Sequence, residues 1–173
     1  EHYYYSEAVR YEKNRRWDEA GTFYRAIIQI NPDNFEANYR LGMLSITVQN
    51  LDDAFKYLQR AMVLKRDDTK VLYQMGVLYF AMGRPREALE YFSRAMDLRE
   101  NTASILHYTG LCHEKLGRSQ EARAYYEKAL LLDPNDCAIQ SSLERVGVMI
   151  EDEKNRWKMP DPRNQSDVEQ GES

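Results

Sequence analysis

One pattern of residues returns every 34 positions between Ala20 and Ala122, with no insertion or deletion. Each copy has a small residue, a bulky apolar residue four positions later, and another apolar or small residue three positions after that. These columns are Ala20, Ala54, Ala88 and Ala122; Tyr24, Leu58, Phe92 and Tyr126; and Ile27, Ala61, Ala95 and Ala129. A fixed period of this length indicates a solenoid of helix pairs, because each unit buries its apolar face only by stacking on its neighbours.

A further column of small residues lies upstream in each unit, at Ala8, Gly42, Gly76 and Gly110. Small side chains there let the two helices of a unit approach closely. Gly83 and Gly117 fall at the turn within a unit, where a left-handed backbone is often needed. We expect the gap to the next unit to be filled by the bulky residue that ends each second helix: Ile30, Leu64, Leu98 and Leu132.

These residues resemble the tetratricopeptide repeat, whose first helix carries a bulky residue, Leu-Gly and Tyr, and whose second helix carries Ala, Phe and Ala before a closing Pro. The third unit matches well, although Glu100 stands where Pro is usual; its matching residues are Leu72, Met75-Gly76, Tyr79, Ala88, Phe92 and Ala95. Other units depart at single positions, such as Glu7, Ser45 and His113. The resemblance implies an all-α fold: a right-handed superhelical solenoid of antiparallel helix pairs.

The resemblance covers residues 1–136 and divides them into four repeats, at 1–34, 35–68, 69–102 and 103–136. Beyond them a helical apolar spacing continues, but Glu144 occupies the column that is small in the four repeats. We therefore predict that residues 137–158 form a capping helix, which a solenoid needs to protect its last apolar face. Residues 159–173 are polar and are expected to form a flexible tail.

In this family the first helix of each repeat lines the concave face. The resemblance therefore places a column of three tyrosines and a histidine in a groove, with an apolar column beside it and a third column that is apolar in the middle and has Glu12 and Glu114 at its ends. We predict that the middle of this groove is an apolar seat for a helix or an extended peptide. The predicted partner-binding residues are Tyr5, Tyr39, Met43, Ile46, Tyr73, Val77, Phe80, His107 and Leu111.

The function that this resemblance favours is a non-catalytic scaffold or adaptor that binds another protein in its concave groove. One alternative is a regulatory or substrate-recruiting domain of a larger enzyme or chaperone-linked complex, and another is self-association. The clamp that holds heat-shock protein carboxylates in some family members is not favoured. Among its matching positions in repeats one to three only Lys70 agrees, and a carboxylate needs charge-assisted donors at fixed geometry.

Catalytic, metal-binding and cofactor-binding patterns are missing from the sequence. It has three histidines and two cysteines, with no metal-ligand spacing and no glycine-rich phosphate loop. His113 stands where the repeat usually has Tyr, so we expect a packed, half-buried imidazole. We therefore predict no enzyme activity, no cofactor and no small-molecule substrate.

Composition bears on partners and location. The formal net charge is −4 and the charges are mixed, so neither nucleic acid nor another polyanion is favoured as a partner. No apolar run is long enough to span a bilayer, and no membrane partner is predicted. Cys112 and Cys137 lack the spacing of a disulfide framework, which favours a reducing, cytoplasmic location. Because the chain begins in a helical pattern without Met, we expect it to be a piece of a longer protein.

Overall fold

The structure is a computed structural model that describes residues 1–98 and 102–158. These residues contain nine α-helices and no strand. The predicted tail and Glu100 lie outside the described residues. The helices are α1 (His2–Lys13), α2 (Trp17–Ile30), α3 (Phe35–Thr47), α4 (Leu51–Leu64), α5 (Thr69–Ala81), α6 (Pro85–Asp97), α7 (Ala103–Lys115), α8 (Ser119–Leu132) and α9 (Cys137–Lys158).

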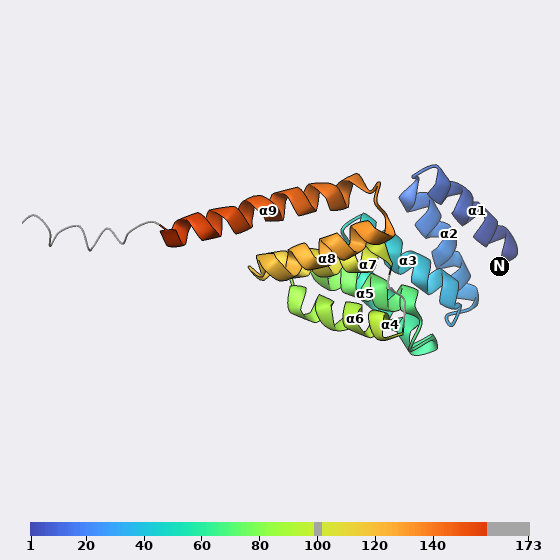
Figure 1. Ribbon diagram of the computed structural model, residues 1–173. Coiled ribbons are helices and arrows are strands. Elements are labelled where there is room, and N and C mark those ends of the chain that lie inside the picture. The colour runs from blue at the N-terminus through green and yellow to red at the C-terminus, as the bar shows by residue number, and fades with distance from the viewer. Residues whose placement is uncertain (99–101, 159–173) are drawn as a thin grey trace, which may run out of the picture.

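The first eight helices pack as antiparallel pairs, α1 with α2, α3 with α4, α5 with α6, and α7 with α8 (Figure 1). The second helix of each pair packs on the first helix of the next unit, and α8 packs on α9 in the same way. Contacts between first helices join α3 to α5, α5 to α7 and α7 to α9. The molecule is therefore an all-α solenoid with the first helices on the inner side and the second helices on the outer side.

Glycine in the small column allows the close approach within a pair. A Cβ added at Gly76 would lie 2.4 Å from the ring of Phe92, and one at Gly110 would lie 2.4 Å from the ring of Tyr126. Both rings are completely buried. The bulky column of the second helix therefore occupies the volume that any side chain on these glycines would need.

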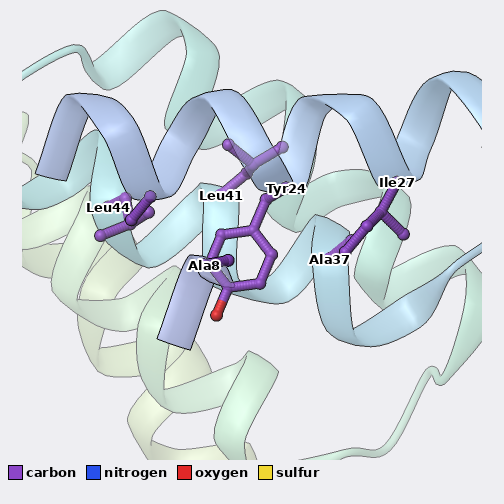
Figure 2. Close-up of a cluster of buried hydrophobic side chains, with 7 residues drawn as sticks. Ala8, Tyr24, Ile27, Ala37, Leu41 and Leu44 are labelled. Atoms are coloured by element: carbon purple, nitrogen blue, oxygen red, sulfur yellow. The ribbon is translucent and has the colours of Figure 1, made fainter. Parts of the chain in front are cut away.

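Stacking of one unit on the next builds the core. Figure 2 shows the cluster between the first two units, where Tyr24 and Ile27 of α2 pack with Leu41 and Leu44 of α3. All four side chains are buried. Because α3 contributes as many bulky groups as α2, each unit depends on its neighbour to cover its apolar face.

The prediction for the ends of the second helices is wrong. Ile30 is 58% exposed, Leu98 43% and Leu132 53%, and only Leu64 is half-buried. The gap between units is filled instead from the following first helix, by residues such as Leu41. Ile30, Leu98 and Leu132 lie at or just after the end of the second helix, beyond that contact, and face solvent.

The turn within each unit has a residue with a left-handed backbone conformation at the same position in all four repeats. The backbone angle φ is 56° at Arg15, 59° at Gln49, 71° at Gly83 and 72° at Gly117. Only glycine adopts this conformation without steric cost, so the first two repeats carry strained turns that the last two avoid.

Helix α9 closes the array. It packs on α7 and α8 and buries Ile139, Val146 and Ile150, while its other side faces solvent. Its C-terminal part projects past the helix pairs (Figure 1). None of the helices in the described part of the chain combines the length and the apolar character needed to cross a membrane.

Candidate functional site

The predicted groove residues all lie on the inner helices α1, α3, α5 and α7. Tyr39 is 9% exposed and belongs to the core of the second and third units. The other eight are half-buried, so each keeps part of its surface accessible: Tyr5, Met43, Ile46, Tyr73, Val77, Phe80, His107 and Leu111.

Aromatic rings meet in the middle of the inner face. The ring of Tyr108 stands nearly perpendicular to that of Tyr73 at 5.8 Å between centroids, and to that of Phe80 at 5.7 Å. It also lies 5.9 Å from Phe92, which is completely buried on α6. Edge-to-face contacts of this kind are favourable and fix ring orientation. Tyr73, Phe80 and Tyr108 therefore form a rigid surface, which we refer to as the aromatic floor.

The two phenols of the aromatic floor remain neutral at physiological pH. Burial, together with the neighbouring Tyr108, raises the pKa of Tyr73 to about 12. Burial likewise raises the pKa of Tyr108. Both hydroxyls are therefore available as neutral donors and acceptors at the edge of an apolar surface.

Sequence reasoning did not place Tyr108 among the groove residues. It stands in a column whose residue type changes from repeat to repeat, through Ser6, Arg40, Gln74 and Tyr108, so no pattern of composition marks it. Position alone was the available signal, because this column lies on the inner helix one residue beyond the tyrosine column.

Two hollows flank the aromatic floor, and each carries one lysine. One has a volume of about 160 Å³ and is lined by Tyr39, Thr69, Lys70, Tyr73, Gln74, Thr102 and Ile105. The other, of about 360 Å³, is lined by Phe80, Ala81, Gly83, Pro85 and Lys115. The middle of the inner face thus combines partly exposed ring surface, two hollows and a lysine beside each hollow.

At the N-terminal end of the inner face, one arginine serves two carboxylates. Arg40 Nη1 lies 3.3 Å from Glu12 Oε2, and Arg40 Nε donates to Glu36 Oε1 at 2.8 Å. Burial raises the pKa of Glu12, and the attraction of Arg40 does not fully offset it. The nearby hydroxyl of Tyr24 is buried and lies close enough to Glu12 to lower the pKa of that carboxyl, but it makes no hydrogen bond of normal geometry within the described residues.

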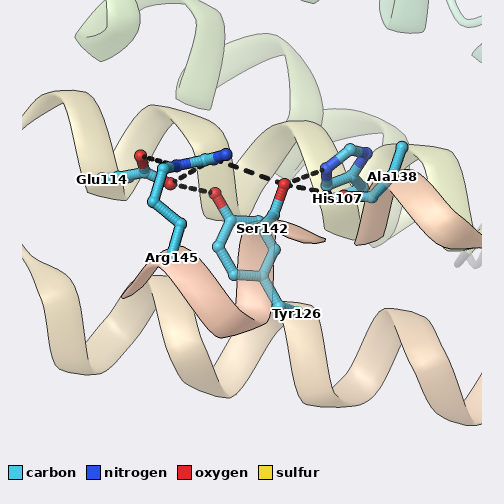
Figure 3. Close-up of polar contacts among 6 residues, drawn as sticks. All are labelled: His107, Glu114, Tyr126, Ala138, Ser142 and Arg145. Atoms are coloured by element: carbon cyan, nitrogen blue, oxygen red, sulfur yellow. Dashed lines mark hydrogen bonds and ion pairs between the residues drawn. The ribbon is translucent and has the colours of Figure 1, made fainter. Parts of the chain in front are cut away.

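At the C-terminal end, one carboxylate has two dedicated donors (Figure 3). Arg145 Nε and Nη2 donate to the two oxygens of Glu114 at 2.8 and 2.9 Å, and the hydroxyl of Tyr126 donates to Oε2 at 2.7 Å. Burial by itself would raise the pKa of Glu114, but these hydrogen bonds outweigh burial and lower it. This network joins α7, α8 and α9.

His107 also contacts α9. Its Nε2 lies 3.0 Å from Ser142 Oγ, and that hydroxyl donates to the carbonyl oxygen of Ala138 at 2.9 Å (Figure 3). The imidazole therefore donates and the serine accepts. Burial lowers the pKa of His107, which favours this neutral form. A residue predicted to face a partner is thus engaged by α9.

Groups with catalytic potential are dispersed and packed. Within residues 1–98 and 102–158, no three or more His, Cys, Asp and Glu side chains gather in a way that would hold a metal ion. Cys112 is buried, which raises the pKa of its thiol to about 12 and keeps it protonated. His113 stacks on Tyr125 at 5.2 Å, the packed imidazole that its position in the repeat predicts.

Comparison with known families gives one match. The family model described as Tetratricopeptide repeat matches residues 33–101 and, overlapping them, residues 67–132. Together the two ranges span more than half of the chain. No curated protein matches the chain.

Several solved structures share the architecture. The type IV pilus biogenesis factor PilW superposes with a TM-score of 0.79 at 20% identity, over 86% of this chain and 69% of that one. PilF of Pseudomonas aeruginosa gives a TM-score of 0.76 at 18% identity, over 86% and 68% of the two chains. MamA gives 0.71 at 22% identity, over 87% and 89%. At these identities the likeness establishes the helical solenoid fold.

Proposed function

Because this chain belongs to the tetratricopeptide repeat family, we propose that it is a non-catalytic scaffold or adaptor that binds another protein in its concave groove. The repeat fold and the family support a role in protein interaction. The observation that supports the groove as the binding surface is the aromatic floor of Tyr73, Phe80 and Tyr108.

The two ends of the inner face differ from its middle in how far their polar groups are already satisfied. At the ends, Glu12 and Glu114 are paired within the chain. In the middle, half-buried rings adjoin two hollows of about 160 and 360 Å³. Rigid aromatic groups dominate binding energy in many interfaces because they bury a large area with little loss of side-chain entropy. The best-fitting partner is a helix or an extended peptide whose apolar side chains enter these hollows.

A capture experiment tests this function. The protein and its Tyr73→Ser/Phe80→Ser variant would each be used to capture partners, and the affinity for each captured protein then measured by titration calorimetry. Truncating two central aromatic anchors should weaken binding at least about 30-fold, since one such anchor contributes about 2 kcal/mol or more. The variant Tyr3→Ser/Leu131→Ser is a matched control, because it removes an exposed aromatic and an exposed apolar residue outside the groove.

Because Tyr73 packs on Phe92, folding of the double variant has to be checked by circular dichroism. The single change Phe80→Ser provides a milder test if the double variant unfolds. Affinity that is the same for the wild type, both groove variants and the control would refute the groove as the binding surface.

The captured partner also distinguishes the adaptor from the alternative role as a regulatory or substrate-recruiting domain of a larger enzyme or chaperone-linked complex. We further propose a cytoplasmic location. Cys112 and the exposed Cys137 are both free thiols, which suits a reducing compartment.

A further inference from the structure

A second surface spans the first three repeats and is formed mostly by their second helices. Val63, near the end of α4, is 68% exposed and lines two hollows at once. The larger, of about 630 Å³, is lined by Met62, Val63, Arg66, Asp67 and Arg94. The smaller, of about 380 Å³, is lined by Ile28, Pro32, Asn38, Lys56, Tyr57, Gln59, Arg60 and Val63. Val63 is therefore an apolar ridge between two recesses.

The charge around this ridge is positive, although the chain has a formal net charge of −4. The cations that line the hollows are Lys56, Arg60, Arg66 and Arg94. Two carboxylates reach them, Asp33 against Arg60 and Asp67 at 3.8 Å from Arg94. Cations therefore outnumber these carboxylates. We refer to Val63 and these four cations as the basic outer patch.

The outward side of α9 has the opposite character. Val148 is 63% exposed, and Glu144, Glu151 and Asp152 are exposed around it. Lys154 Nζ lies 3.7 Å from Glu151 Oε2, so the carboxylates outnumber the cation that reaches them. Residues 144, 148, 151 and 152 are spaced so that they share one face of a helix. That face is opposite the one that buries Val146 and Ile150 against the array. We refer to these four outward residues as the acidic stripe.

We propose that the acidic stripe of one copy of this chain docks on the basic outer patch of a second copy. Each surface presents one exposed valine among charges, and the charges are of opposite sign. The two surfaces lie on different parts of the chain, so the contact is heterologous and joins copies head to tail. Neither surface includes the groove residues, so the concave groove stays free for its own partner.

The composition of the basic outer patch favours a helix of this kind over a nucleic acid. A phosphate backbone would meet Asp33 and Asp67 beside the arginines, and it would leave Val63 uncovered. A helix that carries Val148 between acidic side chains covers the valine and pairs with the cations in one contact.

The strength expected of this contact is modest. Exposed ion pairs contribute little individually and are screened over a Debye length of about 10 Å at 0.1 M salt. Association should therefore appear at high protein concentration and low salt, and raising the salt tenfold should weaken it several-fold. Sedimentation velocity over a concentration series measures both effects.

Charge reversal gives the decisive experiment. The patch variant is Arg66→Glu/Arg94→Glu and the stripe variant is Glu144→Lys/Asp152→Lys. Each variant alone should associate at least about tenfold more weakly than the wild type at low salt, because its two surfaces now carry like charges. When the two are mixed, each surface again meets its opposite, and association should return to nearly the wild-type level.

Two controls separate this contact from general effects of charge and fold. Arg25→Glu/Lys128→Glu makes the same change in net charge as the patch variant on other exposed outer-helix residues, and it should associate like the wild type. Val63→Ser should weaken association several-fold at any salt concentration. A wild-type protein that stays monomeric throughout the series, or a mixture that fails to regain association, would overturn the proposal.

Discussion

The two ends of the inner face carry a glutamate in the same column of the repeat, Glu12 and Glu114. Their pKa values are shifted from the ordinary value in opposite directions. The side chains of Glu12 and Glu114 are 15% and 16% exposed, so burial by exposed area does not separate them. The pKa of Glu12 is raised, with burial as the largest cause, whereas hydrogen bonds overcome burial at Glu114 and lower its pKa.

The difference lies in the donors. At the N-terminal end Arg40 is divided between Glu12 and Glu36, and its closest approach to Glu12 is 3.3 Å. At the C-terminal end Arg145 is bidentate to Glu114. A forked arginine matches both oxygens of a carboxylate, and a shared one does not. The bidentate arginine therefore favours the ionised form of Glu114 more than the shared arginine favours that of Glu12.

The tyrosines beside the two glutamates follow the same division. Tyr24 and Tyr126 are equally buried members of one column. Tyr126 donates to Glu114 at 2.7 Å, but the hydroxyl of Tyr24 makes no hydrogen bond of normal geometry among the described residues. The capping helix brings a complete polar network to one end of the array, and the other end has only a partial one.

A substitution that disturbs packing next to the Glu114–Tyr126–Arg145 network should have the largest effect on stability. Gly110→Ala places a methyl group 2.4 Å from the Tyr126 ring and forces that ring, with its hydroxyl, away from Glu114. We expect a loss of about 3 kcal/mol in the free energy of unfolding, measured by urea denaturation. Gly147→Ala is the control, since a Cβ there meets nothing within 4 Å, and it should stabilise by about 0.5–1 kcal/mol.

At the other end, Ala8 already carries a Cβ in this column. The reverse change Ala8→Gly removes a buried methyl group as well as the helix propensity of alanine, and it should cost about 2 kcal/mol. If Gly110→Ala and Gly147→Ala changed the free energy of unfolding equally, the Tyr126 ring would be able to move without cost. Packing would then not contribute to the difference between the two ends.

Removing each carboxylate tests the contrast directly. Glu114→Gln loses the charge that holds Arg145 and the Tyr126 hydroxyl, and it should lower the free energy of unfolding by about 2 kcal/mol at neutral pH. Glu12→Gln removes a charge that burial disfavours, so its stability should be unchanged or slightly higher. Chemical denaturation of both variants beside the wild type measures the two values, and equal losses would contradict the assignment of distinct environments.

Acid should separate the two ends further. Glutamate has an ordinary pKa of 4.5, and the folded-state pKa of Glu114 is lower, so its contribution is complete above 4.5 and is lost as pH falls through the folded pKa. The folded-state pKa of Glu12 is above 4.5, so its ionisation opposes folding at neutral pH, and this penalty disappears as pH falls to 4.5.

Stability measured against pH should therefore fall less steeply in acid for Glu114→Gln than for the wild type. For Glu12→Gln, any gain seen at neutral pH should vanish in acid. A Glu114→Gln profile that runs parallel to the wild-type profile would show that Glu114 has no stabilised charge.

The smallest expected effect comes from single hydroxyl groups. Tyr126→Phe removes a donor to a carboxylate and should cost about 1–2 kcal/mol. Tyr24→Phe removes a buried hydroxyl whose contact with Glu12 falls short of a normal hydrogen bond, and it should be close to neutral. Denaturation midpoints compare the two, and a substantial loss in Tyr24→Phe would mean that its hydroxyl is satisfied in solution.

Much of the fold was predictable because the same pattern of residues occurs in four repeats. Helix pairing, the close approach at Gly76 and Gly110, and the left-handed turns at Gly83 and Gly117 follow from local residue size and backbone freedom. Placement of the groove residues on the inner helices also follows from their column. The exposure of the residues at the end of the second helix could not be predicted from the sequence. Ile30 and Leu98 are apolar, but they lie beyond the contact with the next unit and face solvent.

The sequence by itself determined that this chain is a solenoid of helix pairs, since a unit with a single apolar face is stable only when stacked on others. Only the tertiary structure decided how the polar and aromatic groups meet. Tyr108 joins rings from two other helices, His107 is engaged by α9, and Arg145 reaches Glu114 from 31 residues away. Such contacts depend on distances of a few ångströms between helices. A repeat pattern predicts which helices are neighbours, but it does not predict contacts made by residues that differ from repeat to repeat.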